Sequence, residues 1–272
     1  MGRAGVSVSG RGRRKMPLKL ILAAALLVGL LGAGPGGAGA EPAVRLEAAG
    51  GFDGYYRSGH WVPFVISLAN QGDEVRAEVR LEWAAMGGNV AVAATPVELP
   101  TGSRKRIFMF APISGSPPLV TAKVVAGAKT LAEAPVRLRA VQPGEMLVGV
   151  VTADPRSFEF LGLLRPGNRR LLPVRLSPAD LPPKAAALRH LDLLAFGAVS
   201  TSDLSADQRA AVGRWVAEGG TVLLGGGPAT ARVLDGLPEL APVRPAGTVV
   251  LSELPALEAF ARLDQVPTAR LG

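Results

Sequence analysis

Nine consecutive residues, from Val75 to Trp83, alternate strictly between apolar and charged side chains. Because successive side chains of a strand point to opposite faces, this pattern predicts a strand with one dry and one wet face. Gly, Pro and Asn separate it from six similar segments, at Val44–Ala48, Val62–Leu68, Asn89–Leu99, Arg104–Phe110, Leu119–Val125 and Ala134–Ala140. Short strands at this spacing predict an antiparallel β-sandwich of immunoglobulin-like type, which we assign to residues 41–142.

The second part of the chain, residues 143–272, has a different pattern. Met146–Val151 is a continuous apolar run, as expected for a strand that is covered on both faces. Candidate strands follow at Leu171–Leu176, Leu191–Gly197, Thr221–Leu224 and Val249–Leu251, and candidate helices at Ser157–Leu164, Ser205–Glu218 and Leu254–Leu263. Pro178–Leu188 is a proline-interrupted link with helical potential near its end. This alternation predicts an α/β domain with a doubly wound parallel sheet.

The best-defined helix is Ser205–Glu218. It begins with the pattern of a capping box, Ser205 followed by Gln208, and two glycines end it. Trp215 shares one face of this helix with several smaller apolar residues. We therefore expect Trp215 in the core and Arg214 in solvent.

The first 40 residues have the pattern of a secretion signal. Six basic residues precede the apolar run Leu20–Leu31, and small residues then lead to Ala40 and Glu41. We expect signal peptidase to cut between Ala40 and Glu41, which places the mature chain outside the cytoplasm. Met16 is a second candidate start. The alternative is a membrane anchor formed by the uncharged residues 20–40, although their strongly apolar part is shorter than the ~20 residues of a spanning helix.

The net charge of +8 belongs mostly to this leader. From Glu41 onward, 24 Lys and Arg residues stand against 22 Asp and Glu residues, so a nucleic-acid partner is not expected. The chain has no Cys, which excludes disulfides, thiolate metal ligands and a cysteine nucleophile. Neither His60 nor His190 has the spacing of a metal ligand, and we predict no metal and no cofactor.

The segments Leu191–Gly197, Leu204–Gln208 and Trp215–Gly227 together resemble the class I glutamine amidotransferase-like domains, which have a flavodoxin-like fold. They are especially similar to the versions fused behind sandwich domains in secreted or membrane-anchored bacterial proteins of unknown function. Gly50–Tyr56 and Gly59–Pro63 resemble the start of the sandwich in those proteins. The resemblance implies an envelope location and a chain that continues past Gly272 into membrane helices.

The chain departs from an active amidotransferase at the nucleophile. Such an enzyme presents Cys in a sharp turn, with a His and an acidic partner. A Ser replacement needs a G-x-S-x-G turn, whereas Gly197–Thr201 has Val199 at that position. His190 precedes its strand, at the sheet end opposite the usual active-site edge, and we interpret it as a solvated loop residue. We therefore expect no glutaminase activity.

Ligands of an open α/β sheet bind outside the carboxyl ends of the strands. The predicted ligand-binding residues at this edge are Thr152, Asp154, Ser200, Thr201, Ser202, Asp203, Gly225, Gly226 and Gly227. The N–H groups of the glycine loop would hold a small polar or anionic ligand. The alternative is that the glycines end a strand and that Ser202 and Ser205 cap a helix, because the loop lacks both the Lys of a P-loop and the G-x-G-x-x-G spacing.

Aromatic residues cluster before and within the first long strand, at Phe52, Tyr55, Tyr56, Trp61 and Phe64. If exposed, Tyr55, Tyr56 and Trp61 would stack on a glycan or a partner protein. We favour their burial, which is the commoner use of such rings. Arg104, Lys105 and Arg106 are expected at a solvated strand edge, where charge discourages pairing with other edges.

Two function classes follow. The first is a non-catalytic binding or scaffolding module of the cell envelope, whose partner is an envelope protein or a glycan. It would associate with the membrane through an uncleaved leader or through further C-terminal sequence. The alternative is a hydrolase of envelope saccharides or amides with Asp154 and Asp203 as acid and base, which two carboxyls about 5–10 Å apart would favour.

Overall fold

A computed structural model describes residues 43–85, 88–115, 119–154 and 156–247, with Pro255 and Ala259. Met1–Glu41 and Pro42–Gly272 are separate compact units, and all structure below belongs to the second. The leader and the strand predicted at Val249–Leu251 lie outside the described residues, as does most of the helix predicted at Leu254–Leu263. Among the helices that are described, none has the length and apolar character needed to cross a bilayer.

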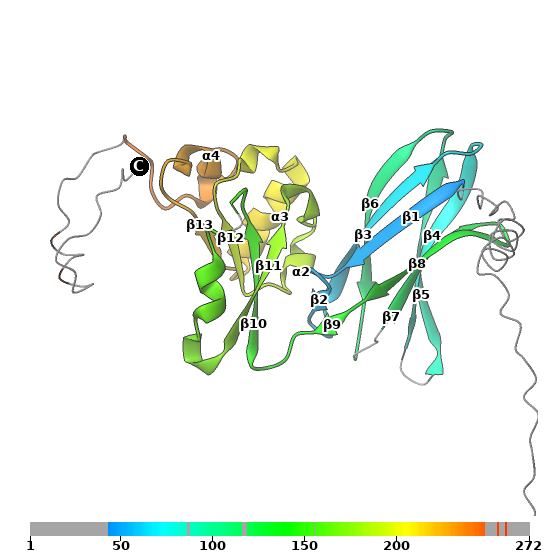
Figure 1. Cartoon of the computed structure of the whole chain (residues 1–272), viewed down its shortest axis with the longest axis horizontal. Helices are drawn as coiled ribbons and strands as arrows, with labels where there is room; N and C mark the ends of the chain where they lie inside the picture. Colours follow the sequence, from blue (N-terminus) through cyan, green and yellow to red (C-terminus); the bar gives the residue numbers. More distant parts are fainter. Residues whose placement is uncertain are drawn as a thin grey trace, which may run out of the picture. The chain divides into compact units, whose positions relative to one another are not determined.

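Residues 43–140, the β part, form two antiparallel sheets around one core, and their strand orders are β1-β3-β6 and β5-β4-β7-β8 (Figure 1). The strands are β1 (Val44–Gly50), β3 (Trp61–Asn70), β4 (Val75–Ala84), β5 (Val90–Leu99), β6 (Arg104–Pro112), β7 (Leu119–Ala126) and β8 (Lys129–Arg137). The short strands β2 (Tyr55–Tyr56) and β9 (Arg139–Ala140) form a separate parallel pair. The last predicted strand is therefore divided between β8 and β9.

The alternation of Val75–Trp83 places β4 in the centre of its sheet, between β5 and β7. Its apolar residues enter the core, and the side chains of Leu81 and Val79 are completely buried. On the wet face, Glu82 accepts a hydrogen bond from Lys123 of β7 at 2.5 Å. The same alternation of residues thus supplies both the core contacts and a half-buried ion pair on the other face.

The outermost strands of the sheets contain charged residues and prolines. In the described structure, β6 pairs with β3 alone, and Arg104, Lys105 and Arg106 are exposed on it as predicted. Of four prolines inside described strands, Pro96, Pro135 and Pro173 lie in outermost strands, whereas Pro63 lies near the start of the central strand β3. Proline has no N–H to donate to a ladder, so an outermost strand tolerates it best.

Residues 145–247, the α/β part, contain a four-stranded parallel sheet with the order β11-β10-β12-β13 (Figure 1). Its strands are β10 (Glu145–Val151), β11 (Arg170–Leu176), β12 (Leu193–Phe196) and β13 (Val222–Leu224). The helices are η2 (Glu159–Leu163), η3 (Pro166–Asn168), η4 (Pro178–Asp180), α2 (Ala185–Leu188), η5 (Thr201–Asp203), α3 (Ala206–Ala217), α4 (Thr230–Asp235) and η6 (Pro238–Leu240). A β part followed by an α/β part agrees with the sequence.

Apolar side chains cover both faces of the parallel sheet. One core joins the sheet to residues of α2, α3 and α4, whereas a smaller core joins its other face to Phe158 and to Leu161 of η2. The segment predicted as a helix at Ser157–Leu164 is a 3-10 helix, and Pro178–Leu188 divides into η4 and the single turn α2.

Helix α3 has the predicted cap and the predicted buried face. Ser205 Oγ accepts a hydrogen bond from the N–H of Gln208 at 3.2 Å, and Gln208 Oε1 accepts from the N–H of Ser205 at 2.8 Å. Trp215 is 3% exposed, which confirms its place in the core. Its indole ring lies against Gly220, where a Cβ atom would come within 2.3 Å of the ring.

Candidate functional site

The structure brings the carboxyl ends of β10, β12 and β13 together. The N–H of Gly225 donates to the carbonyl of Phe196 at 2.8 Å. A Cβ atom on Gly197 would lie 2.5 Å from Oγ1 of Thr152, so only a glycine fits there without a shift. Thr152, Gly197 and Gly225 therefore form a closely packed end of the sheet.

The polar residues of this predicted site are engaged with their own loops. Thr152 Oγ1 accepts from the N–H of Asp154 at 3.1 Å. The Asp154 carboxylate accepts from the N–H of Arg156 and from the Ser157 hydroxyl, each at 3.0 Å. The hydroxyls of Ser200 and Ser202 pair with each other at 2.6 Å.

Thr201 corrects the prediction for this edge because it is completely buried. Its hydroxyl donates to the carbonyl of Val233 at 2.9 Å and accepts from the N–H of Gly236 at 2.8 Å. Thr201 thus fastens η5 to the end of α4 and has no surface for a ligand. The carbonyl of Gly227, which precedes α4, accepts a hydrogen bond from the Thr230 hydroxyl at 2.6 Å.

Asp203, Gly225 and Gly226 remain at least partly accessible at the edge. Ser202 is also exposed, and the hydroxyl that caps α3 is that of Ser205.

The aromatic cluster divides into buried and exposed members. Phe52, Tyr56 and Phe64 are buried as expected, and the Tyr56 hydroxyl donates to the carbonyl of Gly115 at 2.7 Å. Burial therefore removes Tyr56 from the partner or glycan surface that exposed rings would have formed. Trp61 is 52% exposed, so the expected burial was wrong for this ring. Tyr55 is half-buried and packs against the core of the α/β part.

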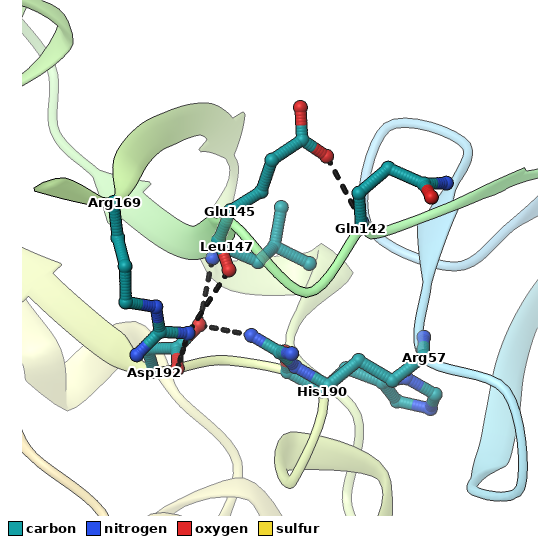
Figure 2. Close-up of polar contacts among 7 residues, drawn as sticks. All are labelled: Arg57, Gln142, Glu145, Leu147, Arg169, His190 and Asp192. Carbon is teal, nitrogen blue, oxygen red and sulfur yellow. Dashed lines mark hydrogen bonds and ion pairs between the residues drawn. The ribbon is translucent and has the colours of Figure 1, made fainter.

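His190 is completely buried, which corrects its interpretation as a solvated loop residue (Figure 2). The N–H of Arg57, in the β part, donates to Nδ1 of His190 at 2.8 Å. The proton of the neutral ring is consequently on Nε2, which lies 3.1 Å from the carbonyl of Trp61. The rings of Phe52 and His60 also contact His190.

Burial lowers the pKa of His190 to about 4, and the nearby His60 and Arg57 act in the same direction, against the bond to Trp61. Protonation of Nδ1 would break the bond from Arg57 and place a cation among apolar rings. His190 therefore works as a neutral link between the β part and the α/β part.

Asp192 extends this link (Figure 2). Its carboxylate pairs with the Arg57 guanidinium and accepts from the N–H of Leu147 at 2.8 Å. Nε of Arg57 also donates to the carbonyl of His190 at 2.9 Å. His190 and Asp192 both lie just before β12, at the end of the sheet opposite the predicted ligand-binding edge. The sequence analysis singled out His190 alone, and no pattern in the sequence pointed to Asp192 or Arg57 as its neighbours.

A second set of contacts between the parts borders an open groove. Arg106 of β6 donates to the Asp180 carboxylate at 2.5 Å. Burial raises the pKa of Asp180, but hydrogen bonds from Ser177 and the Arg106 cation outweigh it, so the net pKa is below its usual value. The Lys184 ammonium lies 4.9 Å from the centre of the Phe110 ring, a cation–π geometry.

The groove itself has a volume of about 770 Å³. Its lining is mostly apolar, and Lys184 is the charged residue in it: Trp61, Thr95, Ile107, Phe108, Met109, Phe110, Pro183, Lys184, Ala186 and Ala187. We call it the β6 groove. The run Ile107–Phe110 is apolar at every position, whereas β4 alternates between apolar and charged residues. This continuous apolar run is the sequence signal that both faces of β6 contact other parts of the protein.

Within the described residues, no cluster of three or more His, Asp or Glu side chains is arranged to hold a metal ion.

A family model described as a domain of unknown function (DUF8726) matches residues 43–139, which is the β part. No curated protein sequence matches the chain.

Solved structures with some likeness include an alkylpurine DNA glycosylase of Pseudomonas fluorescens, at 17% identity over 38% of this chain and 32% of that one, with a TM-score of 0.28. A CARDB domain from Pyrococcus furiosus is 15% identical over 36% of this chain and 87% of that one, with a TM-score of 0.29. The sporulation control protein Spo0M of Bacillus subtilis is 7% identical over 38% of this chain and 51% of that one, with a TM-score of 0.28. Such low similarity carries no functional inference.

Proposed function

We propose that this chain is a non-catalytic binding module of the bacterial cell envelope. In this proposal an immunoglobulin-like β part and a degenerate, flavodoxin-like relative of the class I glutamine amidotransferases are held together by the His190 and Asp192 contacts. The order β11-β10-β12-β13 corresponds to 2-1-3-4 in chain order, which is the flavodoxin-like order as far as it extends.

The observation that carries the proposal is the β6 groove. Both parts of the chain line it, and Trp61 exposes about half of its surface there. Exposed aromatic rings in a concave, mostly apolar site are typical of surfaces that bind a partner.

The geometry of the carboxyl edge favours a binding function over catalysis. Val199 occupies the position that the nucleophile would take, and it packs partly buried against the core of the α/β part. A Cβ atom on the neighbouring Gly197 would meet the side chain of Thr152, so this position is closely packed. The Asp154 carboxylate, the acid or base of the alternative hydrolase, is used in a local turn.

Cosedimentation of the purified chain with isolated bacterial envelopes tests the binding function. We expect saturable binding that Trp61→Ala weakens by about tenfold, because a half-exposed ring at a binding site is a common source of affinity. Val90→Ala is the matched control, since Val90 is 66% exposed on β5 and does not line the groove. Absence of binding, or equal binding by both variants, would contradict the proposal.

N-terminal sequencing of the mature chain, expected to start at Glu41, tests the envelope location.

A further inference from the structure

The β6 groove follows β6, which is an outermost strand of its sheet among the described residues, and Trp61 of β3 also lines it. Four consecutive residues of β6, Ile107–Phe110, line it, although side chains of adjacent residues point to opposite faces. Pro63 and Val65 of β3, which pair with Phe110 and Phe108, are not part of the lining. Thr95 of β5 completes the lining together with Pro183, Lys184, Ala186 and Ala187. An edge strand offers unpaired N–H and C=O groups to such a space.

The two phenylalanines have the spacing of a strand repeat. Their ring centres are 6.4 Å apart, and the ring planes differ by only 13°. Alternate residues of an extended chain are about 6.6–6.8 Å apart, so alternate side chains of an added strand would meet one ring each. A groove that follows an edge with this repeat fits an extended peptide better than a ring-shaped sugar.

Cations lie at the groove and beyond one end of it. Lys184 is in the lining, no carboxylate is, and Arg104 and Lys105 are exposed at the start of β6. Arg106, the third cation of this run, is engaged by Asp180. The same charges that discourage self-pairing of this edge would favour a strand with acidic residues.

We propose that the β6 groove binds an extended acidic peptide segment, which adds to β6 as a new strand. Main-chain hydrogen bonds to the β6 edge would supply affinity. Aliphatic side chains at alternate positions would pack on Phe108 and Phe110, and acidic residues would meet Lys105 and Lys184. This inference rests on the proposed binding function and names the ligand class of the same groove.

The probe is a blocked peptide of the nine-residue length of β6, in which valine alternates with glutamate and threonine. Trp83 and Trp215 are buried, so a change in tryptophan emission on titration reports on Trp61. We expect saturable binding with a shift of the emission to shorter wavelength. N-methylation of alternate peptide amides removes ladder donors and should weaken binding at least about tenfold. Replacement of the glutamates by lysine should weaken it by a similar factor.

On the protein side, we expect Phe108→Ser to weaken peptide binding about tenfold and Lys105→Glu to weaken it several-fold. Val92→Ser is the matched control because Val92 is an exposed strand valine outside the groove, and it should leave binding unchanged. Thermal unfolding of each variant verifies that it is folded.

Equal affinity for the N-methylated or the lysine peptide would overturn the inference, as would the absence of saturable binding. An acidic oligosaccharide such as oligogalacturonate, bound in place of the peptide and lost in Phe108→Ser, would identify a glycan site instead and would also overturn it. If envelopes are bound through Trp61 while the peptide is not, the proposed function stands and the peptide inference fails.

Discussion

At the scale of the residue, Trp215 tests the core of the α/β part. It is buried on α3, whereas the neighbouring Arg214 is exposed and pairs with Glu218 four residues on. We expect Trp215→Ala to lower the free energy of unfolding by about 3–5 kcal/mol, because it leaves a large void. Arg214→Ala should change it by only about 0.5 kcal/mol, since exposed ion pairs contribute little.

Chemical denaturation of the full chain measures both variants, with near-UV circular dichroism to verify the native state. Equally small effects would contradict the assignment of Trp215 to the core.

At the scale of the element, the start of α3 depends more on Gln208 than on Ser205. Beyond its part in the capping box, Nε2 of Gln208 donates to the carbonyls of Pro178 and Leu181, at 2.9 and 2.7 Å. Gln208→Ala removes these two bonds and the Oε1 acceptor of the Ser205 N–H, and it leaves partly buried groups unpaired, which should cost about 2–3 kcal/mol. Ser205→Ala removes one cap acceptor and should cost about 1 kcal/mol. Urea unfolding of the two variants gives the comparison, and a larger loss for Ser205→Ala would show that Gln208 is only a local cap.

At the scale of the whole molecule, His190 makes the stability depend on pH. In the unfolded chain the pKa of this imidazole is near 6.5, and in the folded chain it is about 4. Between these two pH values the unfolded state binds a proton that the folded state does not. The contribution of His190 to the free energy of unfolding is therefore fully present above pH 6.5 and is lost as the pH falls toward 4. The loss amounts to about 3 kcal/mol at pH 4.

Unfolding of His190→Asn between pH 4 and 7.5 checks this prediction. Asparagine can accept the hydrogen bond from Arg57 but does not titrate, so the difference between pH 7 and pH 4 should shrink by about 3 kcal/mol. His60→Asn is the matched control and should keep most of the difference. An unchanged pH profile in His190→Asn would show that other groups, such as the carboxylates, cause the acid sensitivity.

The sequence by itself determined the long strands of the β part, the four described strands of the parallel sheet and the cap of α3. The alternation at Val75–Trp83 and the apolar run at Met146–Val151 are set by local geometry, because a strand has a period of two residues wherever it lies. The capping box likewise needs only residues that are three positions apart. Such features can be predicted without knowledge of the distant chain.

Only the tertiary structure decided which aromatic side chains are buried and where the β6 groove lies. Tyr56 and Trp61 belong to one sequence cluster, yet one is buried and the other half exposed. His190 is buried because Arg57, which is 133 residues away in the sequence, covers it and bonds to it. The β6 groove likewise needs Phe108 and Lys184 to meet across the chain. These contacts depend on how distant segments pack, and no periodicity in one segment encodes its partner in another.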